Sequence, residues 1–338
     1  MSTAATRKDF ISNQEVRWCP GCGDYSILSN IQKVMPEFGI PRENIVFVSG
    51  IGCSSRFPYY MNTFGFHTIH GRAPAFATGI KVSRPELSVW VVTGDGDGLS
   101  IGGNHLLHAI RRNMDLQILL FNNRVYGLTK GQYSPTSRQG MRTKSSPQGS
   151  IDHAIDPISF ALGAGATFVA RTIDVDAPHL QQTLRRAHAH KGTALVEILQ
   201  NCPVFNDKEW KEVEDRKTRL EVSLVLEEGE PLVFGTKRDH GIHIENGVPS
   251  VIELSDQDDP VAAGVAVHRS GHESPSYAFA LASMARPHFP VPTGVIRAVE
   301  QPTYEAVLQD QIDEAIATRG AGDLAALLHS GDTWTVEE

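Results

Sequence analysis

Residues 88–132 read SVWVVTGDGDGLSIGGNHLLHAIRRNMDLQILLFNNRVYGLTKGQ, and they carry the strongest fold information in the chain. Two short apolar runs with β-branched content, Ser88 to Thr93 and Leu116 to Phe121, are typical of strands that are buried on both faces of a sheet. The segment between them, Gly102 to Arg112, has the length of a crossover helix, which parallel strands require. We therefore predict a β-α-β unit in a mostly parallel sheet.

Polar residues follow each of these two strands. Gly94-Asp95-Gly96-Asp97 comes after the first strand and Asn122-Asn123 after the second. The carboxyl ends of parallel strands meet at one edge of the sheet, where ligands bind. Glycines let the backbone approach an anion, a following helix offers its N-terminal amides, and carboxylate and amide oxygens suit Mg²⁺ beside phosphates. The pattern predicts a site for a metal-bridged diphosphate.

The glycine motif differs from two common phosphate-binding patterns. GDGDG lacks the G-x-G-x-x-G order of a dinucleotide fold and the Lys-Ser/Thr ending of a P-loop. Alone, it is also compatible with an ordinary glycine turn. With Asn123 placed 28 positions after Asp95, however, it resembles the signature of thiamine diphosphate enzymes. That resemblance implies Mg²⁺ ligands (Asp95, Asn123 and the backbone carbonyl of Val125) and diphosphate contacts (Gly96, Asp97 and Thr129).

Size and composition are those of an ordinary soluble protein. The chain has 338 residues, of which 41% are hydrophobic and 21% charged, and its net charge of −8 argues against a nucleic-acid-binding surface. No stretch approaches the ~20 apolar residues of a membrane span. Because MSTAATRKDF lacks the apolar core of a signal peptide, we expect a cytoplasmic location. Apolar spacing predicts further helices at 25–38, 73–82 and 178–190, and further strands at 44–50 and 193–199.

The chain contains four cysteines, which are Cys19, Cys22, Cys53 and Cys202. Cys19-x2-Cys22 is a frequent metal half-site, but alone it also fits a zinc knuckle or a redox pair at a helix start. In a cytosolic protein, thiols bind metals or react more often than they form disulfides. Cys53 and Cys202 each follow a predicted strand, so we expect them at the same sheet edge as the diphosphate site. Four converging thiolates suit one 4Fe-4S cluster.

These motifs together resemble the β subunit of 2-oxoacid:ferredoxin oxidoreductases, most of all the 2-oxoglutarate members. They are WCPGCGD (18–24), GIGCSSR (50–56), HGRAPAFATG (70–79), TGDGDGLSIGGNH (93–105), FNNRVYGLTKGQYSPT (121–136) and the late Cys202. The resemblance covers most of residues 13–254, without a departure at any motif position. It implies an α/β, three-layer thiamine diphosphate-binding fold with a mostly parallel sheet, divided into an N-terminal arm (1–17), a thiamine diphosphate and iron-sulfur domain (18–203) and a C-terminal extension (204–338).

The resemblance also implies the residues of the site. The 4Fe-4S ligands would be Cys19, Cys22, Cys53 and Cys202, and further residues that line the thiamine diphosphate would be Ile51, Gly52, Cys53, His70, Gly71 and Leu128. The implied reaction is the oxidative decarboxylation of 2-oxoglutarate with coenzyme A to succinyl-CoA and CO2, with electrons leaving singly through the cluster to ferredoxin.

This chain is expected to be one half of the enzyme. Thiamine sites need a second domain that binds the aminopyrimidine and supplies a glutamate, which is an expectation from the family. The residues before Asn44 are too few for such a domain, and the region after Pro203 lacks the α/β rhythm. We therefore expect an α subunit that carries the glutamate, in an α2β2 assembly.

Several alternatives stay open. Lys130 follows the diphosphate loop, where its ammonium would pair with the distal carboxylate of 2-oxoglutarate; a solvated surface lysine is the alternative. The same chemistry on pyruvate or another 2-oxoacid is also compatible. So are a non-redox thiamine-dependent decarboxylase or synthase with structural zinc and a non-catalytic metal-binding module. His105 and His108 are spaced like a metal pair, but they have no third ligand in register.

Overall fold

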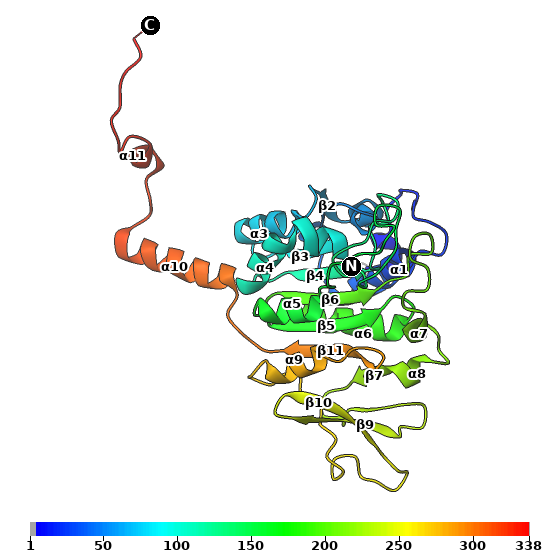
Figure 1. Cartoon of the computed structure of the whole chain (residues 1–338). Coiled ribbons are helices and arrows are strands. Elements are labelled where there is room, and N and C mark those ends of the chain that lie inside the picture. Colours follow the sequence, from blue (N-terminus) through cyan, green and yellow to red (C-terminus); the bar gives the residue numbers. More distant parts are fainter. Residues whose placement is uncertain (1–4, 338) are drawn as a thin grey trace.

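The fold is built on one eight-stranded sheet, seen in a computed structural model that describes residues 5–337 (Figure 1). The strand order is β2-β1-β3-β4-β6-β5-β11-β7. The strands are β1 (Ile45–Ser49), β2 (Phe64–His67), β3 (Ser88–Gly94), β4 (Gln117–Asn122), β5 (Phe168–Ile173), β6 (Ala194–Leu199), β7 (Ser223–Leu226) and β11 (Val291–Ala298). All neighbours are parallel except β5 and β11. The predicted mostly parallel sheet is confirmed.

The predicted β-α-β unit is present at the centre of this sheet. β3 pairs with β4 in parallel, with Gly94 opposite Phe121. The connection passes through the π-helical turn η5 (Asp97–Ile101) and α4 (Gly103–Arg111). Every residue of β4 is buried, because both faces of the sheet are covered. The carboxyl ends of β3 and β4 therefore bring the two predicted motifs to one edge.

Helices cover the two faces and give three layers. Along β1, Phe47 packs in the core with α1 and α6, whereas Val46 and Val48 pack in the core on the opposite face, as the two-residue period of a strand requires. One face carries α1 (Asp24–Val34) and α6 (Ala177–Ala189), and the other carries α3 (Ala73–Ser83), α4, α5 (Pro157–Gly163) and α9 (Ser276–Ala282). The short helices are α2 (Phe57–Tyr60), α7 (Lys211–Glu214), α8 (Arg219–Val222), η1 (Arg7–Phe10), η2 (Met35–Phe38), η3 (Arg42–Asn44) and η4 (Ser54–Arg56).

The C-terminal third is divided between the main sheet, a small sheet and an arm. β7 and β11 complete the main sheet, so that sheet crosses the predicted boundary at residue 203. The sequence predicts no strand at β11 because Pro292 and Gly294 interrupt its apolar run. β8 (Val233–Phe234), β9 (His240–Glu245) and β10 (Val248–Glu253) form an antiparallel sheet, and α10 (Tyr304–Arg319) and α11 (Leu324–Leu328) extend away from the body (Figure 1).

Candidate active site

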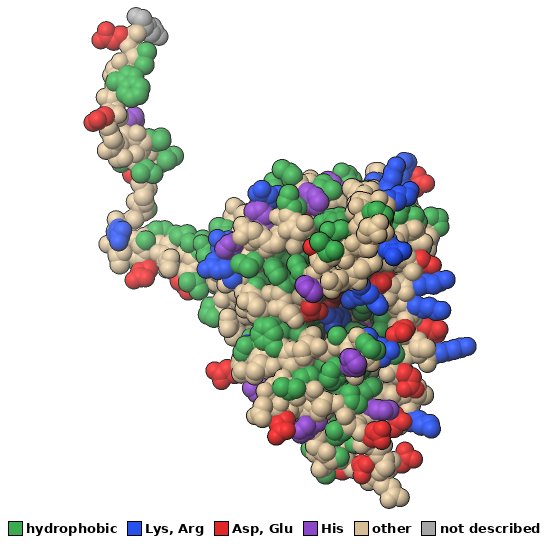
Figure 2. Space-filling view, viewed as in Figure 1, with side chains coloured by type: hydrophobic (Ala, Val, Ile, Leu, Met, Phe, Trp, Pro, Cys, Tyr) green, Lys and Arg blue, Asp and Glu red, His purple; other side chains and the backbone are tan. Residues whose placement is uncertain are grey.

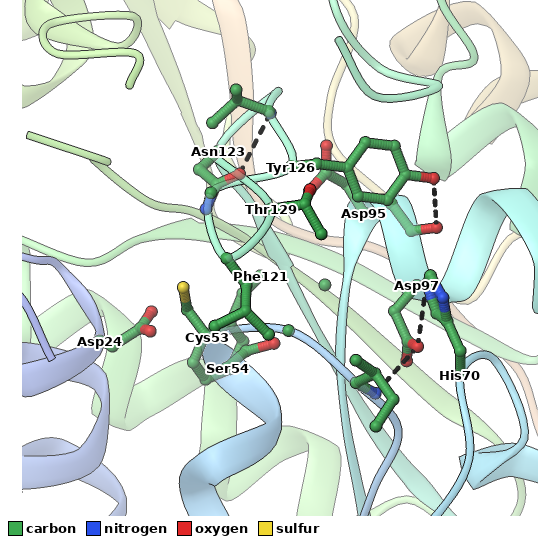
Figure 3. Close-up of a pocket in the computed structure, with 17 residues that line it drawn as sticks. Asp24, Cys53, Ser54, His70, Asp95, Asp97, Phe121, Asn123, Tyr126 and Thr129 are labelled. Atoms are coloured by element: carbon green, nitrogen blue, oxygen red, sulfur yellow. Dashed lines mark hydrogen bonds and ion pairs between the residues drawn. The ribbon is translucent and has the colours of Figure 1, made fainter. Parts of the chain in front are cut away.

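One cavity lies at the carboxyl edge of the main sheet, where β1, β3 and β4 end (Figure 3). Its volume is about 100 Å³. Eleven of the residues predicted to bind the cofactor line it, which are Ile51, Gly52, Cys53, His70, Asp95, Gly96, Asp97, Asn123, Val125, Leu128 and Thr129. Gly71 lies just behind them, where its N–H donates to Asp97 Oδ1 at 2.7 Å. Lys130 follows Thr129 as an exposed residue outside the lining.

Asp95 is buried at the end of β3, with only 2% of its surface exposed. Its Oδ2 accepts hydrogen bonds from Ser134 Oγ at 2.5 Å and from Thr136 Oγ1 at 2.6 Å. Burial raises the pKa of Asp95 above its ordinary value, and the two hydroxyl donors oppose that effect. A cation bound beside this carboxylate would offset the cost of burying its charge. The site therefore fits the predicted Mg²⁺.

The loop after β4 is fixed by its own asparagines. Asn123 Oδ1 accepts from the N–H of Val125 at 3.2 Å, and Asn123 Nδ2 donates to Gln200 Oε1 at 2.8 Å. The Tyr126 hydroxyl donates to the carbonyl of Gly96 at 3.0 Å, so it joins this loop to the GDGDG turn (Figure 3). A Cβ at Gly96 would overlap the Tyr126 ring. Glycine at this position is therefore a packing requirement of the site.

Asp97 accepts hydrogen bonds from three segments of the cavity wall and so holds them together. Its Oδ1 accepts from the N–H groups of Ile51, at 3.0 Å, and Gly71, and its Oδ2 accepts from Thr93 Oγ1 at 2.7 Å. His70 Nε2 lies 3.5 Å from Asp97 Oδ1 (Figure 3). Because an anionic carboxylate repels a diphosphate, these contacts favour a supporting role for Asp97 over the direct contact that the sequence predicts.

Cys53 and Cys202 lie near each other beside this cavity, and Cys22 lies close to them in a turn with Cys19. A Cβ built on Gly127 would lie 3.6 Å from Cys53 Sγ and 3.7 Å from Cys202 Sγ. Cys22 Sγ accepts from Gln200 Nε2 at 3.3 Å, and the N–H of Cys22 donates to the carbonyl of Cys19 at 3.0 Å. Cys53 itself lines the cavity. The predicted cluster site therefore borders the pocket of the predicted thiamine diphosphate site.

The environment of the thiols is buried and negatively charged. Burial, with Asp24 and the neighbouring thiols adding to it, raises the pKa of Cys53 to about 12. The same causes raise the pKa of the Cys22 thiol. A metal bound by these thiols as thiolates would supply the positive charge that stabilises them. Within residues 5–337, no three His, Cys, Asp or Glu side chains lie close enough to hold a single metal ion.

Sequence reasoning missed two buried hydroxyls of the site. Ser134 and Thr136 lie in the polar run 133–151, yet they are only 2% and 1% exposed. Thr136 Oγ1 also lies 2.9 Å from Asn122 Oδ1, so it contacts both halves of the predicted motif. The only local indication is Pro135 between them, which restricts the backbone of the Ser-Pro-Thr turn.

Comparison with known proteins agrees with this architecture. Residues 50–198 match the family described as thiamine pyrophosphate enzyme, C-terminal TPP binding domain. The chain is 53% identical over 334 residues to 2-oxoglutarate oxidoreductase subunit KorB of Mycobacterium tuberculosis, covering 98% of this chain and 88% of that one. It is 50% identical over 202 residues to the 2-oxoacid:ferredoxin oxidoreductase subunit beta of a Sulfolobus species, covering 59% of this chain and 66% of that one.

A solved structure matches over nearly the whole chain. It is the 2-oxoglutarate:ferredoxin oxidoreductase from Magnetococcus marinus with 2-oxoglutarate, coenzyme A and succinyl-CoA bound, with a TM-score of 0.76, 32% identity and 97% of both chains covered. The fold and the site define a thiamine diphosphate-binding subunit of an oxidoreductase. The chain belongs to the family of KorB-type β subunits of 2-oxoglutarate oxidoreductases. Within residues 5–337, no helix combines the length and the apolar character needed to cross a membrane.

Proposed function

We propose that this chain carries thiamine diphosphate, Mg²⁺ and one 4Fe-4S cluster in a cytoplasmic 2-oxoglutarate:ferredoxin oxidoreductase. The enzyme would convert 2-oxoglutarate and coenzyme A to succinyl-CoA and CO2, and two electrons would pass singly to two ferredoxins. The observation that carries the proposal is the position of Cys53. It lines the cavity that holds the Asp95 and Asn123 motif, and its Sγ lies beside the thiol of Cys202 across Gly127.

Oxygen ligands from this chain would hold the metal and the diphosphate. Asp95, Asn123 and the carbonyl of Val125 are hard donors of the kind that Mg²⁺ prefers beside phosphates. When bound, thiamine diphosphate supplies the electron sink for the decarboxylation. His70 is 40% exposed at the cavity wall, so its imidazole can donate a hydrogen bond to a phosphate oxygen.

Electrons would leave through the thiol side of the cavity. Ile51 and Gly52 line the cavity on the same segment as Cys53, so the cofactor and the cluster would share one wall. Cys19, in contrast, is exposed at the surface. This arrangement supports a route from the cavity through the cluster to an external carrier, which we propose is ferredoxin.

Exposed apolar residues near the cavity support the proposal that an α subunit covers it. Large apolar side chains stand exposed on β2, on the segments next to His70 and Gly102, and at Leu128, which lines the cavity. They are Phe64 (61%), Phe66 (46%), Ile69 (66%), Ile101 (59%) and Leu128 (53%). Apolar patches of this kind mark protein interfaces more often than free surface. We call these five residues the apolar rim. We propose that α binds here, supplies the activating glutamate, and assembles with this chain as α2β2.

The test is anaerobic co-purification of this chain with its α subunit. We expect a brown complex with iron, acid-labile sulfide and releasable thiamine diphosphate, which reduces a viologen dye with 2-oxoglutarate and coenzyme A. Faster turnover of pyruvate than of 2-oxoglutarate would overturn the substrate assignment. Zinc in place of iron would overturn the redox assignment, and absence of thiamine diphosphate would overturn both.

A further inference from the structure

The C-terminal arm, defined as residues 303–337, is a feature that the proposed reaction does not use. It begins after β11 and contains α10 and α11, which project from the body (Figure 1). Every residue from Gln309 to Glu337 is exposed. α10 has 16 residues, so this helix alone spans ~24 Å. The arm is therefore long enough to reach another subunit.

The root of the arm, residues 301–305, is held on the body by hydrogen bonds. Asn113 Nδ2 donates to the carbonyls of Gln301 and Pro302, both at 3.1 Å, and the N–H of Asp115 donates to Glu305 Oε1 at 3.3 Å. Glu305 is only 7% exposed. Its Oε2 is buried and accepts no hydrogen bond from the described residues. These contacts fix the direction in which α10 leaves the body and place an unpaired carboxylate oxygen at its root.

The root lies at the opposite edge of the sheet from the cavity. Asn113 and Asp115 precede β4, whereas Asn122 and Asn123 end and follow it. A six-residue strand separates the two edges by ~20 Å. The arm extends away from the body beyond this edge (Figure 1). An α subunit that covers the cavity of the same chain would lie at the other edge, so the arm would point toward a second αβ unit.

Both helices of the arm leave apolar side chains exposed to solvent (Figure 2). In α10, Tyr304, Val307, Ile312 and Ile316 are 41%, 43%, 43% and 49% exposed. In α11, Leu324, Leu327 and Leu328 are 70%, 69% and 71% exposed. A five-residue helix with such a surface is marginal in water, because short helices depend on packing. Its structure implies a surface that receives it.

The charge of the arm indicates what receives it. Residues 303–338 hold eight Asp and Glu but one Lys or Arg, Arg319, so they carry nearly all of the net charge of −8. Two arms would repel each other. Residues 1–302 are almost neutral, with 30 Lys and Arg against 31 Asp and Glu. A second copy of this chain therefore offers no overall positive charge to match the arm. A positively charged surface that matches the arm is therefore expected on the α subunit.

We propose that the C-terminal arm docks on the α subunit of a second αβ unit, in an apolar groove bordered by lysines and arginines. Leu324, Leu327 and Leu328 would fill the groove, and the carboxylates of α10 would face its basic border. The arm then ties two halves of an α2β2 assembly together. This inference rests on the proposed function only for the presence and position of the α subunit.

The first test locates the arm in the purified α and β complex. Leu327 is replaced by the photoreactive p-benzoylphenylalanine, and the irradiated complex is digested and analysed by mass spectrometry. We expect cross-links from position 327 to α. Val248, which is 67% exposed on β10, serves as the matched control and is expected to give none. Cross-links from position 327 to β, or none at all, would overturn the proposal.

The second test measures the assembly that the arm holds together. The double variant Leu327→Asp and Leu328→Asp should weaken the association of two αβ units by about a hundredfold, because two apolar anchors are lost. Sedimentation should then show αβ in place of α2β2, with iron and thiamine contents unchanged. An intact α2β2 would overturn the proposal. Because this readout is assembly, a complex that docks but does not oxidise 2-oxoglutarate would refute the proposed function and leave the arm assignment standing.

Discussion

The two buried hydroxyls on Asp95 are the most specific contacts of the site. Both donate to the same carboxylate oxygen, Oδ2, from a Ser-Pro-Thr turn that the main chain brings back over β3. Two donors on one oxygen restrict rotation of the carboxylate and leave Oδ1 as the oxygen better placed to bind a cation. Thr136 also contacts Asn122, whose Nδ2 donates to Glu197 Oε1 at 2.6 Å. Cofactor affinity should therefore depend on Thr136, although it does not line the cavity.

Thr136→Val should weaken the binding of thiamine diphosphate with Mg²⁺ by about tenfold, because a hydrogen bond to a charged group contributes ~1.5–3 kcal/mol and Ser134 retains the other one. Titration calorimetry on the metal-depleted complex measures this. Thr136→Ser, which keeps the hydroxyl, should restore most of the affinity. Thr143→Val is the matched control, since among the described residues the Thr143 hydroxyl has hydrogen-bond contacts only with Ser145 and Ser146 of the same loop. Equal effects of the substitutions at 136 and 143 would refute a specific role for Thr136.

Lys130 provides a test of substrate choice. It follows Thr129 at the cavity wall and has a φ of 78°, in the left-handed region that non-glycine residues seldom adopt. If its ammonium pairs with the distal carboxylate, Lys130→Ala should lower kcat/KM for 2-oxoglutarate by about tenfold and leave that for pyruvate unchanged. Initial rates with both acids measure the ratio. Lys144→Ala, at another exposed lysine of the following loop, is the control. If the Lys130→Ala variant keeps the same preference for 2-oxoglutarate over pyruvate, Lys130 does not select the substrate.

The helices and strands differ in how well the sequence predicts them. The β3-α4-β4 unit is predictable because its strands are buried on both faces and so read as continuous apolar runs. β11 is not, because Pro292 and Gly294 interrupt its pattern and its partners β5 and β7 are remote in sequence. The position of Ser134 and Thr136 is set by contacts with Asp95, some 40 residues earlier. Local periodicity contains no information on such contacts.

α7 provides a prediction about pH and stability. Burial, with Asp174 and Asp207 nearby, raises the pKa of Glu214 on this helix to about 7, and its buried Oε1 has no hydrogen-bond partner among the described residues. The folded state therefore binds the proton more tightly than the unfolded state, so Glu214 reduces stability as pH rises from about 4.5 toward 7, and the full cost is present above pH 7. Glu214→Gln should remove that cost.

The expected result is a thermal midpoint about 2 °C higher at pH 8 and unchanged at pH 5, measured by calorimetry on the complex. Glu212→Gln is the matched control, because Glu212 lies on the same helix but its side chain is 65% exposed and paired with Arg286. It should change the midpoint little at either pH. A gain for Glu214→Gln that is equal at pH 5 and pH 8 would show that charge is not the cause.

Across the whole molecule, exposed apolar residues occur at two separate places. The apolar rim runs from β2 and the segments next to His70 and Gly102 to Leu128 at the cavity wall, and the C-terminal arm leaves from the edge of the sheet opposite the cavity. We interpret the first as the contact within one αβ unit and the second as the contact between two units. Substitutions on the two surfaces should therefore have different effects on assembly, and a comparison of them tests the whole arrangement.

Phe64 is the residue of the rim that separates these roles best. It lies on β2, at the edge of the main sheet, and is 61% exposed. A carboxylate buried at that position would lack a partner, so Phe64→Asp should weaken binding of α by about a hundredfold or more. Sedimentation should show free β with its iron retained, whereas the arm variant Leu327→Asp with Leu328→Asp should yield αβ. Val248→Asp, on the edge of the small sheet, should leave α2β2 intact. If Phe64→Asp also stops at αβ, the rim does not bind the α subunit of its own unit, and both surfaces act between units.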